Sequence, residues 1–157
     1  MTSINESTIF EIIPYVGTNL VIFGMTSFQV EGVLGKSDKK SKNPTLEGFD
    51  EFWSDIVVGY SESGIVEHIG FGRQMKNVIY NGINLFYIKS SVALRKILEI
   101  DPEPLEYLGF LVFFKLGLYL SGFDNDEESD DKAAALFVRG HWDSRKPKMK
   151  KFNFSGA

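Results

Sequence analysis

The chain contains no cysteine, only two histidines, and no apolar stretch long enough to cross a membrane. The missing thiols exclude disulfides, thiolate metal sites and cysteine nucleophiles, and they favour a reducing, cytoplasmic setting. The most apolar segment, residues 105–123, is interrupted by charged residues and glycines, so we expect it in the core of a soluble fold. The N-terminal segment has neither basic residues nor a long apolar run, and therefore does not predict a signal peptide.

Aromatic residues and glycine are abundant, with 14 Phe, 6 Tyr, 2 Trp and 15 Gly in 157 residues. Rings and glycines at this density favour strands joined by tight turns over a helical bundle. The length corresponds to one domain with a sizeable core. We therefore predict a single α+β domain over residues 1–157, built from an antiparallel β-meander sheet and two short helices.

Two short segments carry helix signals. The first begins at Thr26 or Ser27, whose side chains can cap it, and ends at Gly35, which tolerates a left-handed conformation. The second begins at Ser90 or Ser91 and is stopped by the two prolines that follow it.

The strand signals are strongest around two turns. Residues 53–60 and 65–71 flank the turn Ser61–Gly64, and the pair Asn81–Gly82 closes a second hairpin. We expect both hairpins in one antiparallel meander. In the strand 65–71, strict alternation places Glu67 on the same face as Ile69, and His68 on the other face. Further strands are predicted within residues 10–23, 105–123 and 133–139, the last of these being the final strand.

Two polar segments interrupt this pattern, and there is no internal repeat or domain boundary in the sequence. Residues 36–48 are rich in lysine and predict an exposed, mobile loop, and we expect both termini to be mobile as well. Residues 124–131 predict a long acidic loop between two strands.

The acidic loop is the candidate partner-binding site. Its first carboxylates alternate as in a calcium-binding loop, but Ser129 stands where that loop needs glycine and Ala135 where it needs a bidentate glutamate. We therefore expect no metal and no cofactor, and a loop that is either solvated or faces a cationic partner. The candidate residues are Asp124, Asp126, Glu127, Glu128, Asp130 and Asp131.

The two histidines, His68 and His141, are the one pair that could supply imidazole acid–base chemistry. The ordinary interpretation is structural: His68 lies on a strand of the sheet, and His141 is a polar anchor beside Trp142. We therefore predict no catalytic residues.

Nucleotide and nucleic-acid binding have little support. The Gly70–Gly72 pair lacks the third glycine and the lysine of a phosphate-binding loop. The C-terminal residues 145–151 are mostly basic, yet the net charge of the chain is −4, so nucleic acid is not the expected partner.

Three short segments resemble a known class of proteins. They are Phe23, Gly24 and Met25 followed by Val30, Leu34 and Gly35; the hairpin over residues 60–69; and Asn81, Gly82, Ile83 and Leu85. Over about residues 20–100 the chain resembles the small immunity proteins that accompany bacterial polymorphic toxins, including contact-dependent growth inhibition systems. The Phe-Gly-Met start also occurs in small outer-membrane assembly lipoproteins and in lactamase-inhibitor repeats, but the chain has no lipobox cysteine.

The resemblance implies that the chain binds one cognate toxin domain, commonly a nuclease, and blocks it without chemistry of its own. An acidic loop would steer association with the basic surface of such a toxin. Two alternatives stay open. One is a small-molecule-binding or scaffolding domain with an apolar cavity lined by Phe110, Phe113 or Phe114. The other is a nuclease-like enzyme in which His68 and His141 converge on one cleft.

Overall fold

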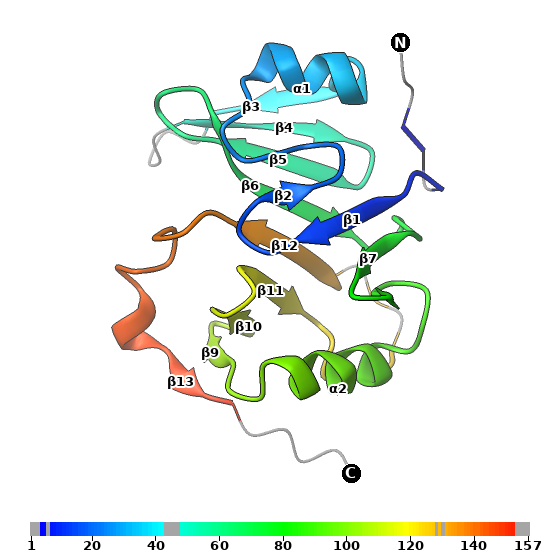
Figure 1. Cartoon of the computed structure of the whole chain (residues 1–157), viewed down its shortest axis with the longest axis vertical. Helices are drawn as coiled ribbons and strands as arrows, with labels where there is room; N and C mark the ends of the chain where they lie inside the picture. The colour runs from blue at the N-terminus through cyan, green and yellow to red at the C-terminus, as the bar shows by residue number, and fades with distance from the viewer. Residues whose placement is uncertain (1–3, 6, 43–47, 128, 130, 153–157) are drawn as a thin grey trace.

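The computed structural model describes residues 4, 5, 7–42, 48–127, 129 and 131–152 of the chain. Within these ranges the chain forms two α-helices, one short 3₁₀ helix and 13 strands (Figure 1). The helices are α1 (Ser27–Leu34), α2 (Ser90–Ile100) and the 3₁₀ helix η1 (Lys146–Lys148).

Two sheets contain the strands. In pairing order, the nine-stranded, antiparallel sheet contains β13 (Lys150–Lys151), β9 (Leu105–Tyr107), β10 (Phe110–Phe113), β11 (Leu118–Ser121), β12 (Ala133–Phe137), β6 (Val66–Gly72), β5 (Ile56–Tyr60), β4 (Phe49–Trp53) and β3 (Lys39–Ser41). The four-stranded sheet contains β2 (Gly17–Thr18), β1 (Phe10–Ile13), β7 (Val78–Tyr80) and β8 (Ile83–Asn84). The predicted α+β class, with antiparallel meanders and two short helices, is confirmed.

The large sheet consists of two similar halves. Helix α1 is followed by the antiparallel run β3 to β6, and helix α2 by the antiparallel run β9 to β12. The halves meet where β6 pairs antiparallel with β12, so the strand order reads the same outward from this pair in both directions. The sequence shows no internal repeat, but the topology contains one.

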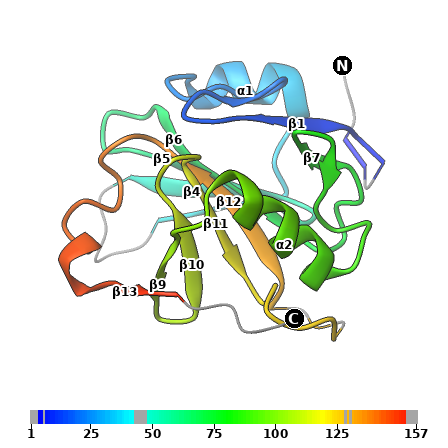
Figure 2. The same ribbon diagram turned by 60° about the horizontal axis from the view of Figure 1, so that its bottom comes forward.

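One face of the large sheet packs on the core. Helix α1, the small sheet and α2 cover this face, with the helices at its two ends (Figure 1, Figure 2). Val30 and Leu34 of α1 and Leu94 and Ile97 of α2 are buried in the same hydrophobic cluster as the inward side chains of the large sheet. Removing this apolar surface from water is the main force that holds the layers together.

Local signals define α1 as predicted. The Thr26 side chain accepts a hydrogen bond from the Gln29 backbone, and the Gln29 side chain accepts one from the Thr26 backbone, which forms a capping box. Gly35 ends the helix at φ 87°, and its carbonyl accepts a 2.9 Å hydrogen bond from the indole of Trp53 in β4. This bond fastens the helix to the large sheet.

The start of α2 differs from the prediction. Its N-cap residue is Lys89, whose side chain makes no capping bond, and the two serines lie inside the first turn. The capping acceptor comes from the acidic loop: Asp126 Oδ1 accepts from the Ser91 backbone N–H at 2.8 Å, and Oδ2 from the Ser91 hydroxyl at 2.9 Å. A carboxylate from a distant segment replaces the local serine cap.

Both predicted hairpins exist, but they lie in different sheets. β5 and β6 pair across the turn at residues 61–65, whereas β7 and β8 pair across Asn81 and Gly82, both of which have positive φ. β7 also pairs in parallel with β1, so the second hairpin belongs to the small sheet. The prediction of one meander is therefore wrong for this hairpin.

Several strand boundaries also differ. Trp53 ends β4 rather than opening the first hairpin, and β3 occupies part of the predicted loop 36–48, of which residues 43–47 lie outside the described residues. The apolar segment 105–123 holds three strands, and residues 10–18 hold two short ones. β12 ends at Phe137 and is not the final strand, because β13 pairs with β9.

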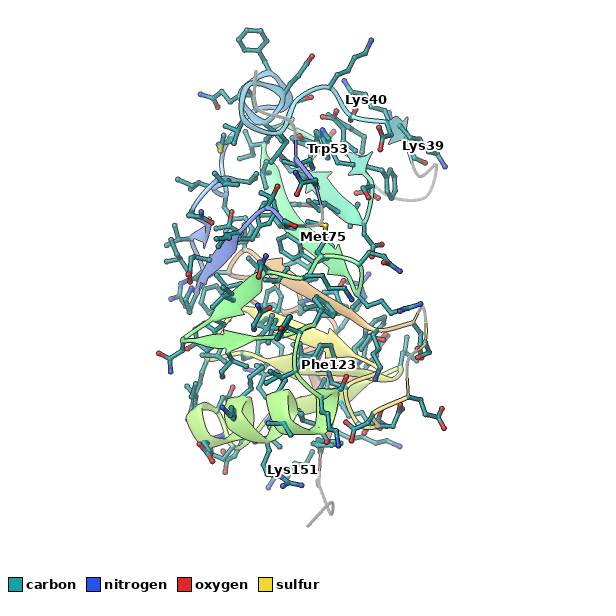
Figure 3. All side chains as sticks on the ribbon, turned by 90° about the vertical axis from the view of Figure 1, so that its right-hand side faces the viewer. Lys39, Lys40, Trp53, Met75, Phe123 and Lys151 are labelled. Carbon is teal, nitrogen blue, oxygen red and sulfur yellow. The ribbon has the colours of Figure 1, made fainter. Side chains whose placement is uncertain are left out.

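Lysines mark both edges of the large sheet. Lys39 and Lys40 lie in β3, and Lys150 and Lys151 in β13, all exposed, while Trp53 of β4 is buried (Figure 3). Charged edge strands discourage pairing with another chain. Part of the predicted basic tail is thus incorporated into the sheet.

Candidate functional site

The face of the large sheet that points away from the core carries the candidate site. A groove of about 280 Å³ lies on it, over the middle strands β5, β6, β12 and β11. Small residues form its floor and rings stand beside them; the lining includes Phe52, Asp55, Val57, His68, Gly70, Gly72, Tyr119, Ala133 and Ala135.

The glycines on this face make room for neighbouring side chains. A Cβ on Gly70 would lie 2.8 Å from Val57 Cγ1 and 3.8 Å from the Ala135 Cβ. A Cβ on Gly72 would meet the Asp55 carboxylate, whose Oδ2 accepts a 2.8 Å hydrogen bond from the Gln74 backbone. The groove therefore exists because larger side chains are missing from its floor.

A β-bulge in β6 turns two consecutive polar residues onto the face of the large sheet that carries the groove. Gly59 pairs with His68 and Tyr60 with Val66, so Glu67 is the extra, unpaired residue. Val66 and Ile69 on either side are both buried in the core. The strict alternation expected for this strand is wrong, because the bulge shifts the pattern by one residue and places Glu67 beside His68.

His68 is held by its neighbours in the neutral form. Its Nε2 lies 2.9 Å from the Tyr119 hydroxyl, and its ring stacks on that of Tyr119 at a centroid distance of 5.8 Å. Burial, with a smaller contribution from His141, lowers the pKa of His68 to about 4. Burial also raises the pKa of Tyr119 to about 12, so both groups are uncharged at neutral pH.

The structure brings the two histidines together. The segment after β12 folds back, so that the rings of His141 and His68 stack at 5.9 Å and 24°. Trp142 packs edge-on against Tyr119 at 5.7 Å and against Tyr107 at 6.1 Å. The predicted association of His141 with Trp142 is present in this aromatic cluster.

The geometry of the two imidazoles favours packing over acid–base chemistry. An acid and a base acting together need opposite protonation states and pKa values near the working pH. Burial lowers the pKa of His141 as it does that of His68, with the Arg145 charge lowering it further. The near-parallel rings are stacked on each other rather than facing across a shared space, and only His68 lines the groove.

Two carboxylates beside His68 have no partner in the described part of the chain. A Cβ on Gly59 would lie 3.0 Å from Asp50 Oδ1 and 3.2 Å from the His68 Cβ, so the absence of a side chain here brings Asp50 to the histidine. Burial raises the pKa of Asp50, and burial together with the Asp50 charge raises the pKa of Glu67. Within the described ranges neither carboxylate makes a hydrogen bond or an ion pair.

Sequence reasoning missed Asp50, Phe52 and Tyr119. Asp50 and Phe52 alternate with the buried residues Glu51 and Trp53, but an acidic and an aromatic residue stand on each face of β4, so the sequence offered no alternation signal. Tyr119 gave no signal either, since its partner His68 is 51 residues away.

The acidic loop folds back on the body of the protein. Lys132 is buried, and its Nζ donates hydrogen bonds to the carbonyls of Gly122, at 2.6 Å, and Asn125, at 2.8 Å. Asp126 accepts hydrogen bonds from Ser91 at the start of α2. It also lines a second cavity of about 190 Å³ together with Lys76, Lys89 and Lys132.

Among the other predicted partner-binding residues, Asp124, Glu127 and Asp131 are exposed. Asp131 accepts a hydrogen bond from the Ser129 hydroxyl. Glu128 and Asp130 lie outside the described residues. The loop leads directly into β12, and Ala133 at the start of that strand lines the groove.

Two other expectations concern cavities and metals. The groove is not lined by Phe110, Phe113 or Phe114, and Phe113 is buried in the core. Within the described ranges no three His, Asp or Glu side chains are grouped so that they could hold a metal ion. None of the helices there is long and apolar enough to span a membrane.

No family model, no curated protein and no solved structure matches this chain. The chemistry of the sheet face that carries the groove is therefore the basis for proposing a function.

Proposed function

We propose that the chain is an immunity protein that binds a cognate bacterial toxin domain in the cytoplasm and neutralises it without catalysis. The observation that supports this most directly is the grooved face of the large sheet, which is not covered by α1, the small sheet or α2. It carries two carboxylates, Asp50 and Glu67, that have no partner among the residues the structure describes. We call this surface the groove face; its defining side chains are Asp50, Phe52, Glu67, His68 and Tyr119.

A sheet face normally packs on another layer of structure. Here the middle of the large sheet offers rings and a floor of Gly and Ala to the outside, with polar groups beside them. Ring-rich surfaces with a polar rim are typical of protein interfaces, which bury roughly 800 Å² on each partner. A toxin domain seated on the groove face would supply the missing layer.

The exposed carboxylates near the groove also support a toxin domain as the partner. Asp124, Glu127 and Asp131 are exposed on the loop that enters β12, at one end of the groove. Toxins that cleave nucleic acid need basic surfaces to bind phosphates. Carboxylates around the groove would accelerate association with such a surface.

The test uses the product of the gene directly upstream, co-expressed with this chain. We expect the wild-type chain to form a complex with that product and to restore growth. Phe52→Lys, in the groove wall, should weaken the complex by about 100-fold or more, because it places a charge in the ring-lined part of the interface. Phe28→Lys is the matched control, because Phe28 is 84% exposed on α1, beyond the opposite face of the sheet.

Absence of binding to that product contradicts the proposal. Equal binding by Phe52→Lys and the wild-type chain, with both variants folded by circular dichroism, removes the groove face from the interface.

A further inference from the structure

The second cavity, of about 190 Å³, lies at the start of α2 and is much larger than a single water molecule needs. Three segments line it: the turn after β6, residues 86–90 and the acidic loop. The ring of Phe86 meets the buried ring of Phe123 at a centroid distance of 5.6 Å. One wall of the cavity is therefore fixed by the core.

Basic side chains dominate this cavity. Its lining contains one carboxylate, Asp126, and four bases, namely Arg73, Lys76, Lys89 and Lys132. Among the residues that the structure describes, none of the three lysine ammonium groups forms an ion pair with a carboxylate. A concave site with several positive charges and one negative charge attracts anions.

Lys132 is the buried cation of the cavity. Only 6% of its surface is exposed, and its ammonium group donates hydrogen bonds to the carbonyls of Gly122 and Asn125. An ammonium group has three N–H donors, so one donor remains for a ligand. A buried charge is costly without a counter-charge, and carbonyl groups carry no net charge. An anion in the cavity would supply the counter-charge.

The hydroxyl of Ser90 adds a donor without a partner. Ser90 is the first residue of α2, is only 8% exposed and lines the cavity. Its hydroxyl makes no hydrogen bond with any residue that the structure describes, whereas the donors of Ser91 are bonded to Asp126. A buried hydroxyl without a partner costs stability, and the start of a helix favours negative charge. The unused hydroxyl therefore points to an anionic acceptor.

A phosphate group suits this set of donors better than a carboxylate does. At neutral pH a phosphate monoester carries close to two negative charges and three strong acceptor oxygens, whereas a carboxylate carries one charge and two oxygens. Several ammonium groups and a hydroxyl can each find an acceptor on one phosphate. Tyr87, which is 75% exposed, also lines the cavity, and its ring offers a surface to the organic part of a monoester.

We propose that the cavity at the start of α2 binds a phosphate group, either free or as a phosphate monoester, through the ammonium groups of Lys76, Lys89 and Lys132. The hydroxyl of Ser90 donates a further hydrogen bond to it. This site lies outside the surface to which the toxin is proposed to bind, and it does not depend on the immunity role.

The first experiment titrates the full chain, labelled with ¹⁵N, with inorganic phosphate, with adenosine monophosphate and with adenosine, at constant ionic strength. We expect saturable shifts of the amide signals of Lys89, Ser90 and Lys132 with both phosphates and none with adenosine. Tighter binding of the monophosphate identifies a phosphate monoester as the ligand, and equal or weaker binding identifies free phosphate. Absence of saturable shifts with both phosphates, or equal shifts with adenosine, would overturn the proposal.

The second experiment changes the cations. Lys76→Gln combined with Lys89→Gln should weaken phosphate binding about tenfold or more, because charge-assisted hydrogen bonds are lost. The control pair, Lys96→Gln with Lys115→Gln, removes the same charge from exposed positions that do not line the cavity, and should bind as the wild type does. Unchanged binding by the first pair, or equal weakening by both pairs, contradicts the proposal.

The variant Ser90→Ala separates a binding role from a structural one. It should weaken phosphate binding about tenfold, because a hydrogen bond to a charged group is lost. Without phosphate, its thermal midpoint should equal or exceed that of the wild type, because the hydroxyl has no partner in the described structure. Phosphate should raise the midpoint of the wild type more than that of the variant. A lowered midpoint without phosphate, or undiminished phosphate binding, would show that this hydroxyl supports the fold rather than the ligand.

Discussion

His68 links the groove to the pH dependence of stability. Its pKa is about 4 in the folded protein and 6.5 in its ordinary state, so the unfolded chain binds this proton more readily. The stability that the neutral ring provides is present above pH 6.5 and is lost as the pH falls toward 4. Asp50 and Glu67 have raised pKa values and act in the opposite direction, since their protonation favours the folded state.

We therefore predict that His68→Gln flattens the loss of unfolding free energy between pH 7 and pH 4.5. The difference between variant and wild type should be on the order of 2 kcal/mol over this range, reduced because the ring is partly exposed. Urea unfolding at both pH values measures it. A wild-type profile as flat as that of the variant would show that His68 is not the responsible group.

Gly70 illustrates how a missing side chain shapes the groove. We predict that Gly70→Ala destabilises the protein by about 1–3 kcal/mol, because its Cβ would lie 2.8 Å from Val57 Cγ1 and force that side chain to move. Gly32→Ala is the comparison: Gly32 lies on the exposed side of α1 with nothing within 4 Å of its Cβ position. That variant should be more stable by about 0.5–1 kcal/mol, and equal effects of the two would contradict the packing described here.

At the scale of elements, α2 depends on a cap that comes from another part of the chain. The Asp126 carboxylate accepts two hydrogen bonds from Ser91, and these bonds lower the pKa of Asp126. This contribution to stability is present above the ordinary pKa of an aspartate and is lost as the pH falls through the lowered value.

We predict that Asp126→Ala lowers the thermal midpoint and speeds hydrogen exchange in the first turn of α2. Glu127→Ala, on the neighbouring exposed residue, should change neither. Hydrogen exchange measured by mass spectrometry tests both variants. Equal protection of residues 90–94 in the wild-type chain and in Asp126→Ala would show that the cap does not stabilise the helix.

The elements that could be predicted have local causes. The Thr26 cap, Gly35 and the Asn81–Gly82 turn each act within a few residues, and the structure has all three. The Asp126–Ser91 cap joins residues 35 positions apart. The bulge at Glu67 exists because of how β6 pairs with β5, and the parallel pairing of β1 with β7 joins distant segments.

The site was predicted only in part for the same reason. The sequence identified His68 and His141 as the candidate imidazole pair, but the stacking of their rings depends on the path of the chain after β12. Asp50 and His68 come together because Gly59, which has no side chain, lies between them in the sheet. These contacts are products of tertiary structure, and no spacing along the chain indicates them.

At the scale of the whole molecule, the acidic loop adds a long-range electrostatic effect. We predict that the variant with Asp124→Asn, Glu127→Gln and Asp131→Asn associates more slowly with the upstream product and shows a weaker dependence of the rate on salt. The fold should be nearly unaffected, because exposed charges contribute little to stability. Asp126 is left unchanged, since it caps α2.

Association rates at two ionic strengths provide the measurement. An unchanged rate and an unchanged salt slope would exclude the loop from steering. Slower association together with a lowered thermal midpoint would point instead to a disturbed loop structure.

The paired halves of the large sheet set an order of events during synthesis. Strands β3 to β6 can all pair with one another once residue 72 has emerged from the ribosome. The other neighbour of β6 is β12, where Phe71 pairs with Ala134, and β12 is made only about 60 residues later. Until then β6 is an unpaired edge strand, and it carries side chains that are buried in the finished protein. Such edges promote aggregation of incomplete chains. The nascent protein is therefore most vulnerable while its second half is being translated, and a chain truncated before β12 would leave open the strand edge at the centre of the finished sheet.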